Sequence, residues 1–214
     1  MLKAIIFDYN GVLINDVQIH ETSYLQAGRD MGFPVSRQTI SKYISYDPDQ
    51  KRKLYFGDIP DEQWEKLFRA KTRYYFEVAE RGELVFPEVD GVLTSLSKRY
   101  TLALISNTPR NYFDRVFPRS LAVLFRETLF ADEVENPKPS PDPVLKVLRR
   151  LGFRKDQCCY VGDSVLDIRM AKTAGIPVFA VTTGDNSRNE LETEGADDVL
   201  TNLMELKKRL ETVL

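Results

Sequence analysis

The sequence is poor in histidine and carries almost no net charge. Its 214 residues include one His, and 30 Lys plus Arg oppose 32 Asp plus Glu, which gives a formal net charge of -2. A single His leaves little room for a His-rich metal site or for a relay of several imidazoles. Because nucleic acids and anionic membranes attract an excess of basic charge, neither is an expected partner. Carboxylates are therefore the abundant candidates for acid, base and nucleophile.

Cysteines and long apolar runs are also scarce. The two cysteines, Cys158 and Cys159, are adjacent, and neighbouring side chains of a strand point to opposite faces, so we expect reduced core residues. The N-terminal apolar run, residues 4–7, is too short for a signal peptide or a membrane span, which favours a cytoplasmic protein. With 43% hydrophobic residues, the chain can bury the core of one domain that carries an insert.

Short apolar runs rich in β-branched residues alternate with segments of helical periodicity. The runs cover residues 4–7, 101–105, 158–161 and 177–181, and the helical segments cover residues 92–99, 144–151 and 165–174. Continuous apolar strands are typical of a parallel sheet that helices bury on both faces. The alternation predicts an α/β fold, a Rossmann-like doubly wound parallel sheet. Its ligand site is expected beyond the carboxyl ends of the strands.

Residues 17–82 interrupt this alternation. They contain many aromatic and basic residues, and a segment that opens at Asp61 and runs through Leu67 to Tyr75 has a helical pattern. We therefore expect a helical insert with its own small core, placed between the first strand and the rest of the sheet. The predicted core domain then comprises residues 1–16 and 83–214.

Four polar clusters lie at or near the ends of the predicted strands. They are Asp8-Tyr9-Asn10-Gly11-Val12, Ser106-Asn107-Thr108, Lys138 within residues 136–141, and Gly162-Asp163-Ser164-Val165-Leu166-Asp167. Any one of them could simply cap a helix. In this order they resemble the four motifs of the haloacid dehalogenase superfamily of phosphohydrolases. The resemblance extends over nearly the whole chain, and the insert stands where that family places its helical C1 cap.

The resemblance is to the C1-capped phosphatase subgroup, which includes phosphoglycolate phosphatases and β-phosphoglucomutase-like enzymes. It implies that Asp8 is the nucleophile and forms an aspartyl-phosphate. It also implies a Mg2+ cofactor, whose ligands are the Asp8 carboxylate, the Asp163 carboxylate and the main-chain carbonyl of Asn10. Asp167 either binds the ion directly or contacts the groups that bind it. Mg2+ suits this site because it is a hard cation that prefers oxygen ligands.

The other motif residues are expected to bind the phosphate group of a small phosphorylated metabolite. By the same resemblance, Lys138 bridges the nucleophile and the phosphate, while Ser106 and Asn107 donate hydrogen bonds to phosphate oxygens. His20 matches a His that the family often carries on the first cap helix. It could contact residue 10 or the substrate, or be an interfacial His without a catalytic role.

Asn10 departs from the family pattern. Phosphatases of the family usually have Asp two residues after the nucleophile, where it protonates the leaving group, and an amide cannot exchange that proton. Losing such an acid costs about 100- to 10,000-fold in rate. An engineered Asp-to-Asn change is the favoured explanation, because every other motif position is intact. A natural enzyme that uses another acid or water, and a slow enzyme or ligand binder, are the alternatives.

We therefore expect a Mg2+-dependent phosphatase. One alternative is a 2-haloacid dehalogenase, although the carboxylate pair Asp163 and Asp167 has no purpose where halide leaves without metal. Another is a catalytically weak module that binds a phosphorylated ligand. The sequence does not distinguish a phosphatase from a phosphomutase, nor does it identify the substrate or the oligomeric state.

Overall fold

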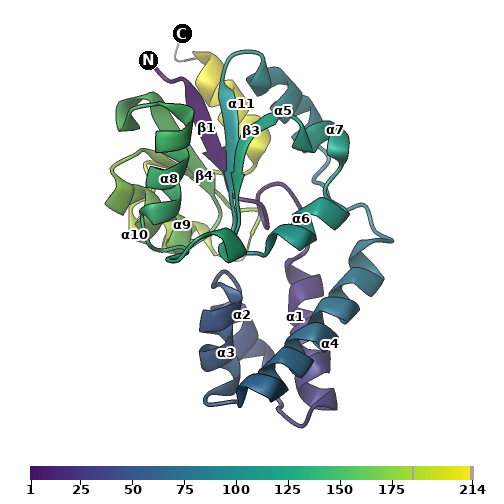
Figure 1. Cartoon of the computed structure of the whole chain (residues 1–214). Helices are drawn as coiled ribbons and strands as arrows, with labels where there is room; N and C mark the ends of the chain where they lie inside the picture. The colour runs from purple at the N-terminus through teal and green to yellow at the C-terminus, as the bar shows by residue number, and fades with distance from the viewer. Residues whose placement is uncertain (185, 213–214) are drawn as a thin grey trace. The chain divides into compact units, whose positions relative to one another are not determined.

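The chain folds into two compact units. The computed structural model describes residues 1–184 and 186–212, and Figure 1 follows the chain through them. One unit contains the described residues of Met1–Asn15 and Val85–Leu214, and the other contains Asp16–Leu84. That the second unit serves as a cap remains a prediction.

The first unit is built on a six-stranded, all-parallel sheet with the order β3-β2-β1-β4-β5-β6. The strands are β1 (Ala4–Phe7), β2 (Thr101–Ile105), β3 (Phe125–Leu129), β4 (Cys158–Gly162), β5 (Val178–Val181) and β6 (Asp198–Leu200). Ala4 of β1 pairs with Thr101 of β2 on one side and with Cys158 of β4 on the other. The strand that leads to Asp8 is therefore central, and every residue of β1 is buried.

Helices cover both faces of this sheet, so the predicted Rossmann-like α/β class is confirmed. The α-helices are α5 (Val89–Ser97), α6 (Arg110–Val116), α7 (Arg119–Ala122), α8 (Asp142–Leu151), α9 (Val165–Ala174), α10 (Arg188–Glu194) and α11 (Leu203–Thr212), with short 3-10 turns η1 (Ala131–Glu133) and η2 (Lys155–Gln157). In Figure 1, α8, α9 and α10 lie on one face and α5 and α11 on the other. Helices α8 and α9 both end at a left-handed glycine, Gly152 and Gly175.

The two outer strands, β3 and β6, are absent from the sequence prediction. The central residues of β3 are Arg126, Glu127 and Thr128, which are exposed or half-buried at the edge of the sheet. Strand β6 has only three residues and begins at Asp198. Edge strands need no continuous apolar run, since only part of their surface is buried.

Cys158 and Cys159 are buried and form no disulfide, as predicted. They are the first two residues of β4, so their side chains point to opposite faces of the sheet. Burial raises the pKa of the Cys158 thiol to about 11 and raises that of Cys159 as well. Both are thus inert thiols at neutral pH.

The second unit is helical throughout its described residues. Its helices are α1 (Val17–Asp30), α2 (Arg37–Lys42), α3 (Pro48–Phe56) and α4 (Asp61–Ala79). Tyr24, Ile40, Trp64 and Leu67 belong to a separate apolar cluster that holds these helices together. These helices and their apolar cluster occupy the stretch for which the sequence predicts a helical insert, residues 17–82.

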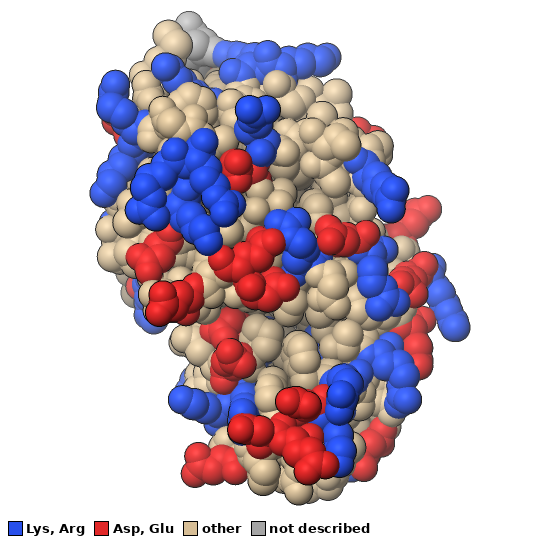
Figure 2. Space-filling view, viewed as in Figure 1, with Lys and Arg blue, Asp and Glu red and all other residues tan. Residues whose placement is uncertain are grey.

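Charges of both signs are spread over the face of the molecule shown in Figure 2. Figure 2 shows Lys and Arg interspersed with Asp and Glu, with a group of basic side chains over α8, whose last turn contains Arg149 and Arg150. Among the described residues, no helix is both long and apolar enough to cross a membrane.

Candidate active site

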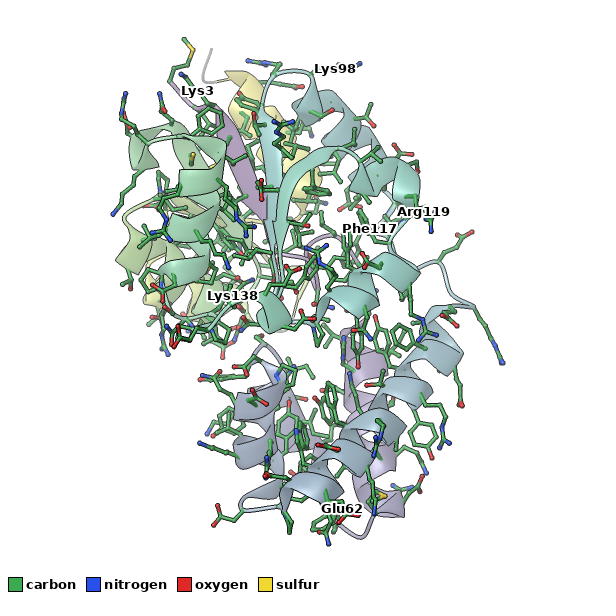
Figure 3. The ribbon with its side chains drawn as sticks, viewed as in Figure 1. Lys3, Glu62, Lys98, Phe117, Arg119 and Lys138 are labelled. Atoms are coloured by element: carbon green, nitrogen blue, oxygen red, sulfur yellow. The ribbon has the colours of Figure 1, made fainter. Side chains whose placement is uncertain are left out.

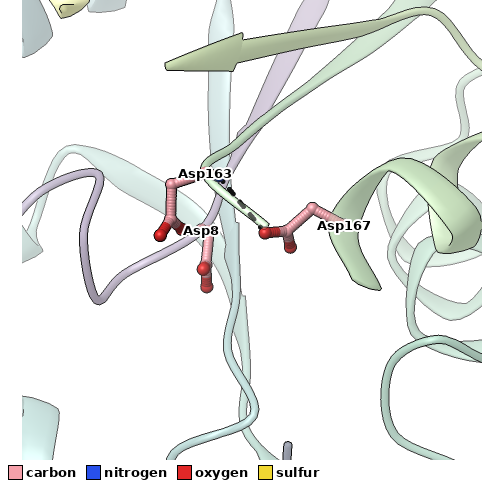
Figure 4. A group of neighbouring side chains, drawn as sticks. All are labelled: Asp8, Asp163 and Asp167. Carbon is pink, nitrogen blue, oxygen red and sulfur yellow. Dashed lines mark hydrogen bonds between the residues drawn. The ribbon is translucent and has the colours of Figure 1, made fainter. Parts of the chain in front are cut away.

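Three carboxylates meet at the carboxyl end of the central strands. Asp8 directly follows β1, Asp163 directly follows β4, and Asp167 lies in the first turn of α9. The backbone N–H of Asp8 donates to the carbonyl of Val161 at 2.8 Å, which extends the sheet by one residue. One oxygen from each of the three carboxylates lies within 4.8 Å of the others, and all three side chains are buried (Figure 4).

Lys138 supplies a positive charge to this cluster (Figure 3). Its Nζ donates to Asp8 Oδ1 and to Asp167 Oδ1, both at 2.7 Å. The main chain of Lys138 is fixed by Asn107, which accepts from its N–H at 3.0 Å and donates to its carbonyl at 3.2 Å. Asn107 therefore holds Lys138 in place, and its contact with a substrate phosphate stays a prediction.

The second oxygen of Asp167 is held by the turn that starts α9. Asp167 Oδ2 accepts from the Ser164 hydroxyl at 2.6 Å, from the Ser164 N–H at 3.1 Å and from the Asp163 N–H at 3.3 Å. Ser164 is also the N-cap of the helix and accepts from the Asp167 N–H. Because both Asp167 oxygens accept hydrogen bonds, this side chain is held at both ends of its carboxylate.

The electrostatics of the cluster keep Lys138 charged. Burial alone would lower the pKa of the ammonium, but the carboxylates of Asp167 and Asp8 outweigh it and raise that pKa above its usual value. Burial raises the pKa of Asp8 to about 6, although Lys138 opposes the shift, and Asp167 adds to it. Three carboxylates facing one ammonium leave an excess of negative charge, and their hard oxygens suit a divalent cation such as Mg2+.

Two glycines make room for the Asp163 carboxylate. Gly11 has a left-handed φ of +72°, and a Cβ there would lie 2.4 Å from Asp163 Oδ2. At Gly184 a Cβ would lie only 1.6 Å from the same oxygen. The Thr183 hydroxyl next to it donates to the Gly11 carbonyl at 2.6 Å, which ties the two loops together. Sequence reasoning missed Gly184, whose only signal is that it follows a predicted strand.

The side chain of Asn10 faces the motif that follows β2. Asn10 Oδ1 accepts from the Thr108 hydroxyl at 2.7 Å and from the Ser106 hydroxyl at 3.3 Å. The Thr108 N–H in turn donates to Ser106 Oγ at 3.1 Å. The structure thus brings together Asp8, Asn10, Ser106, Asn107, Lys138, Asp163 and Asp167, as the motif order implies. Thr108 joins them as a residue to which the sequence assigned no role.

His20 lies on α1, in a buried polar cluster within the helical unit. Its Nε2 is 3.1 Å from Asp16 Oδ2, and its Nδ1 is 2.7 Å from Lys71 Nζ. The hydroxyl of Tyr75 donates to the same Asp16 oxygen at 2.6 Å. Burial lowers the pKa of His20 to about 4, and the charge of Lys71 lowers it further, so the imidazole is neutral at pH 7. A contact of His20 with substrate or with residue 10 stays a prediction.

Comparison with known proteins gives matches over most of the chain. The family model of haloacid dehalogenase-like hydrolases matches residues 5–181. The phosphoglycolate phosphatases of Escherichia coli (strain K12) and Salmonella typhimurium (strain LT2) are 36% identical to it over 152 and 153 residues, respectively, each covering 70% of the chain. The chain spans 60% and 58% of the length of these two relatives.

Solved structures match the fold. A hydrolase from Pseudomonas syringae has a TM-score of 0.84 and 21% identity, and the match covers 99% of each chain. CbbY from Rhodobacter sphaeroides, crystallised in complex with phosphate, has a TM-score of 0.82 and 22% identity, with 96% of each chain covered.

Proposed function

Since the chain belongs to the family of haloacid dehalogenase-like hydrolases, we propose that it is a phosphatase of that family acting on a small phosphorylated metabolite. The observation that carries the proposal is the placement of Lys138 against Asp8, beside Asp163, at the carboxyl end of the central strand. The likeness to phosphoglycolate phosphatases supports the same reaction class. The helical unit is proposed to act as the cap that covers the substrate.

Asp8 is the proposed nucleophile. A carboxylate repels a phosphate dianion, so the attack requires positive charge beside it. Lys138, which already contacts Asp8 Oδ1, provides one such charge and would shift part of its interaction to the phosphate. The Ser106 hydroxyl can turn its one proton from Asn10 Oδ1 to another phosphate oxygen when the substrate binds. An Asp8 oxygen bonds to phosphorus as the bond between phosphorus and the substrate's alcohol oxygen breaks, and the alcohol leaves. Water then hydrolyses the aspartyl-phosphate to inorganic phosphate and free Asp8.

Asp8, Asp163 and the main-chain carbonyl of Asn10 are the proposed ligands of Mg2+. When bound, the ion neutralises the phosphate and the carboxylates during transfer. Asp167 already accepts from Lys138, Ser164 and the Asp163 N–H. We therefore propose that Asp167 does not bind the ion directly and instead orients Lys138 and the proposed ligand Asp163.

Asn10 sets the rate expected of this chain. Its amide can donate a hydrogen bond to a leaving oxygen but cannot supply a proton, so turnover is expected to be slow. An engineered Asp-to-Asn change remains the favoured origin of this residue. Asn10 is also the observation that favours a second candidate, a module that binds a phosphorylated ligand without hydrolysing it.

The test is phosphate release by the parent chain and by Asn10→Asp, measured with phosphoglycolate, sugar phosphates and nucleoside monophosphates. We expect Asn10→Asp to gain about 100- to 10,000-fold in rate on at least one compound and to lose this activity in EDTA. Asp8→Asn in the same background is the matched control and should abolish turnover. A variant that stays silent on the whole panel favours the binding module. In a parallel assay with a 2-haloacid, halide release that survives EDTA favours a dehalogenase.

A further inference from the structure

We propose that Thr108 is a positioning residue that orients the side chain of residue 10 for its role in leaving-group departure. The inference rests on the proposed phosphatase function. It concerns a side chain that the four motifs leave without a role, and it is carried by the hydrogen bonds around Asn10.

Two hydroxyl groups converge on one atom of Asn10. The distance from Thr108 Oγ1 to that atom is 2.7 Å, which is typical of an O–H donor on an oxygen acceptor and shorter than most N–H···O bonds. The Ser106 hydroxyl approaches the same atom at 3.3 Å. Since Ser106 Oγ already accepts from the Thr108 N–H, its proton can point toward Asn10. The shared atom is therefore the amide oxygen.

This pattern fixes which end of the side chain can act on a substrate. With Oδ1 held by Thr108 and Ser106, the planar amide of Asn10 must direct Nδ2 away from both hydroxyls. A carboxyl group at position 10 would be held in the same way through one oxygen. Proton transfer to the leaving group would then fall to the other oxygen. Thr108 thus sets the direction of the acid without touching the reacting atoms.

Thr108 is suited to this task because it is itself fixed. Its side chain is buried, and its N–H is tied to Ser106 Oγ. Valine has nearly the same shape as threonine but lacks the hydroxyl. Thr108→Val therefore removes the orienting hydrogen bond and lets the side chain at position 10 adopt other staggered rotamers. The carboxyl becomes charged as it gives up its proton, and loss of one hydrogen bond to a charged group corresponds to about 10- to 100-fold in rate.

The experiment compares Thr108→Val and Thr108→Ser in the Asn10→Asp background on two substrates. The first is the best alkyl phosphate of the panel, whose alcohol must be protonated as it leaves. The second is p-nitrophenyl phosphate, whose phenolate leaves without a proton. We measure kcat/KM, because it includes every step up to leaving-group departure and excludes the later hydrolysis of the aspartyl-phosphate.

We expect Thr108→Val to lower kcat/KM by about 10- to 100-fold for the alkyl phosphate and by less than about threefold for p-nitrophenyl phosphate. Thr108→Ser, which keeps the hydroxyl, should restore the alkyl rate. Equal losses on both substrates, or no loss on either, would overturn the assignment. If Thr108→Val does not fold, Thr108→Ala carries the same comparison. If Asn10→Asp alone has no activity on either substrate, the proposed phosphatase function is refuted, and the role of Thr108 with it.

Discussion

Replacing Gly184 with alanine should expel Asp163 from the proposed metal site. The new methyl carbon would stand 1.6 Å from Asp163 Oδ2 and 2.4 Å from its Cγ. Ordinary contact between such atoms is about 3.5 Å, so the carboxylate has to retreat by roughly 2 Å. Mg2+ holds its oxygens at about 2.0 Å in near-octahedral geometry and tolerates little displacement. Asp163 can then no longer bind an ion that Asp8 also binds.

We expect the Mg2+ affinity of Gly184→Ala to fall by at least about 10- to 100-fold, the range seen when residues that position metal ligands are removed. Isothermal titration with Mg2+ measures this directly. Urea denaturation provides an independent reading: Mg2+ at 100 times the parent dissociation constant stabilises the parent by about 2.7 kcal/mol. It should stabilise the variant by only about 0.4 to 1.4 kcal/mol.

Gly91→Ala is the matched control. Gly91 lies in α5, where an added Cβ meets no atom within 4 Å, so this variant should bind Mg2+ like the parent. A folded Gly184→Ala that binds Mg2+ with the parent's affinity would refute the reasoning. It would mean that Asp163 is not a ligand.

Three further predictions concern side chains whose partners the structure defines. Lys138→Met removes the ammonium group that pairs with the buried carboxylates of Asp8 and Asp167. Urea denaturation should show a free energy of unfolding lower by about 3–5 kcal/mol, and an unchanged value would contradict the ion pairs. The pKa of His20 is about 4 in the native state, below its value of about 6.5 in the unfolded state, so the native state binds fewer protons between these pH values. The free energy of unfolding should therefore fall by about 3 kcal/mol as pH drops from about 6.5 to 4. Urea denaturation of His20→Gln across this pH range should lack that fall. Ser164→Ala removes a helix cap and a donor to Asp167, and a loss of about 1 kcal/mol in urea denaturation is expected, whereas no loss would show that the cap is dispensable.

The buried strands of this fold could be predicted from the sequence because each is a continuous apolar run. Residues 4–7 and 101–105 match β1 and β2 in full, since both strands are covered by helices on their two faces. The edge strands could not be found in this way. The three central residues of β3 are polar and exposed or half-buried, and β6 is too short to show a pattern.

The members of the candidate site could be predicted from motif order, but their mutual contacts could not. Asp8 and Asp163 directly follow strands, and parallel strands bring such positions together. Lys138 lies between η1 and α8 and reaches Asp8 from there. The pairing of Asn107 with the main chain of Lys138 depends on the path of two loops that are 31 residues apart. The contact of Gly184 with Asp163 is a steric fact that appears only once the loops are placed.

The central position of β1 has a consequence for how the protein is made. Ala4 pairs with Thr101 and Cys158, so the strand that leads to the nucleophile is synthesised before both of its neighbours and must wait for them. The helical unit, Asp16–Leu84, is one continuous stretch of the chain with its own apolar cluster, so it can fold meanwhile. We therefore expect nascent chains that stop before β2 to contain a folded helical unit together with an unpaired, apolar β1. The nucleophile would be assembled only late in synthesis, when the parallel sheet closes around it.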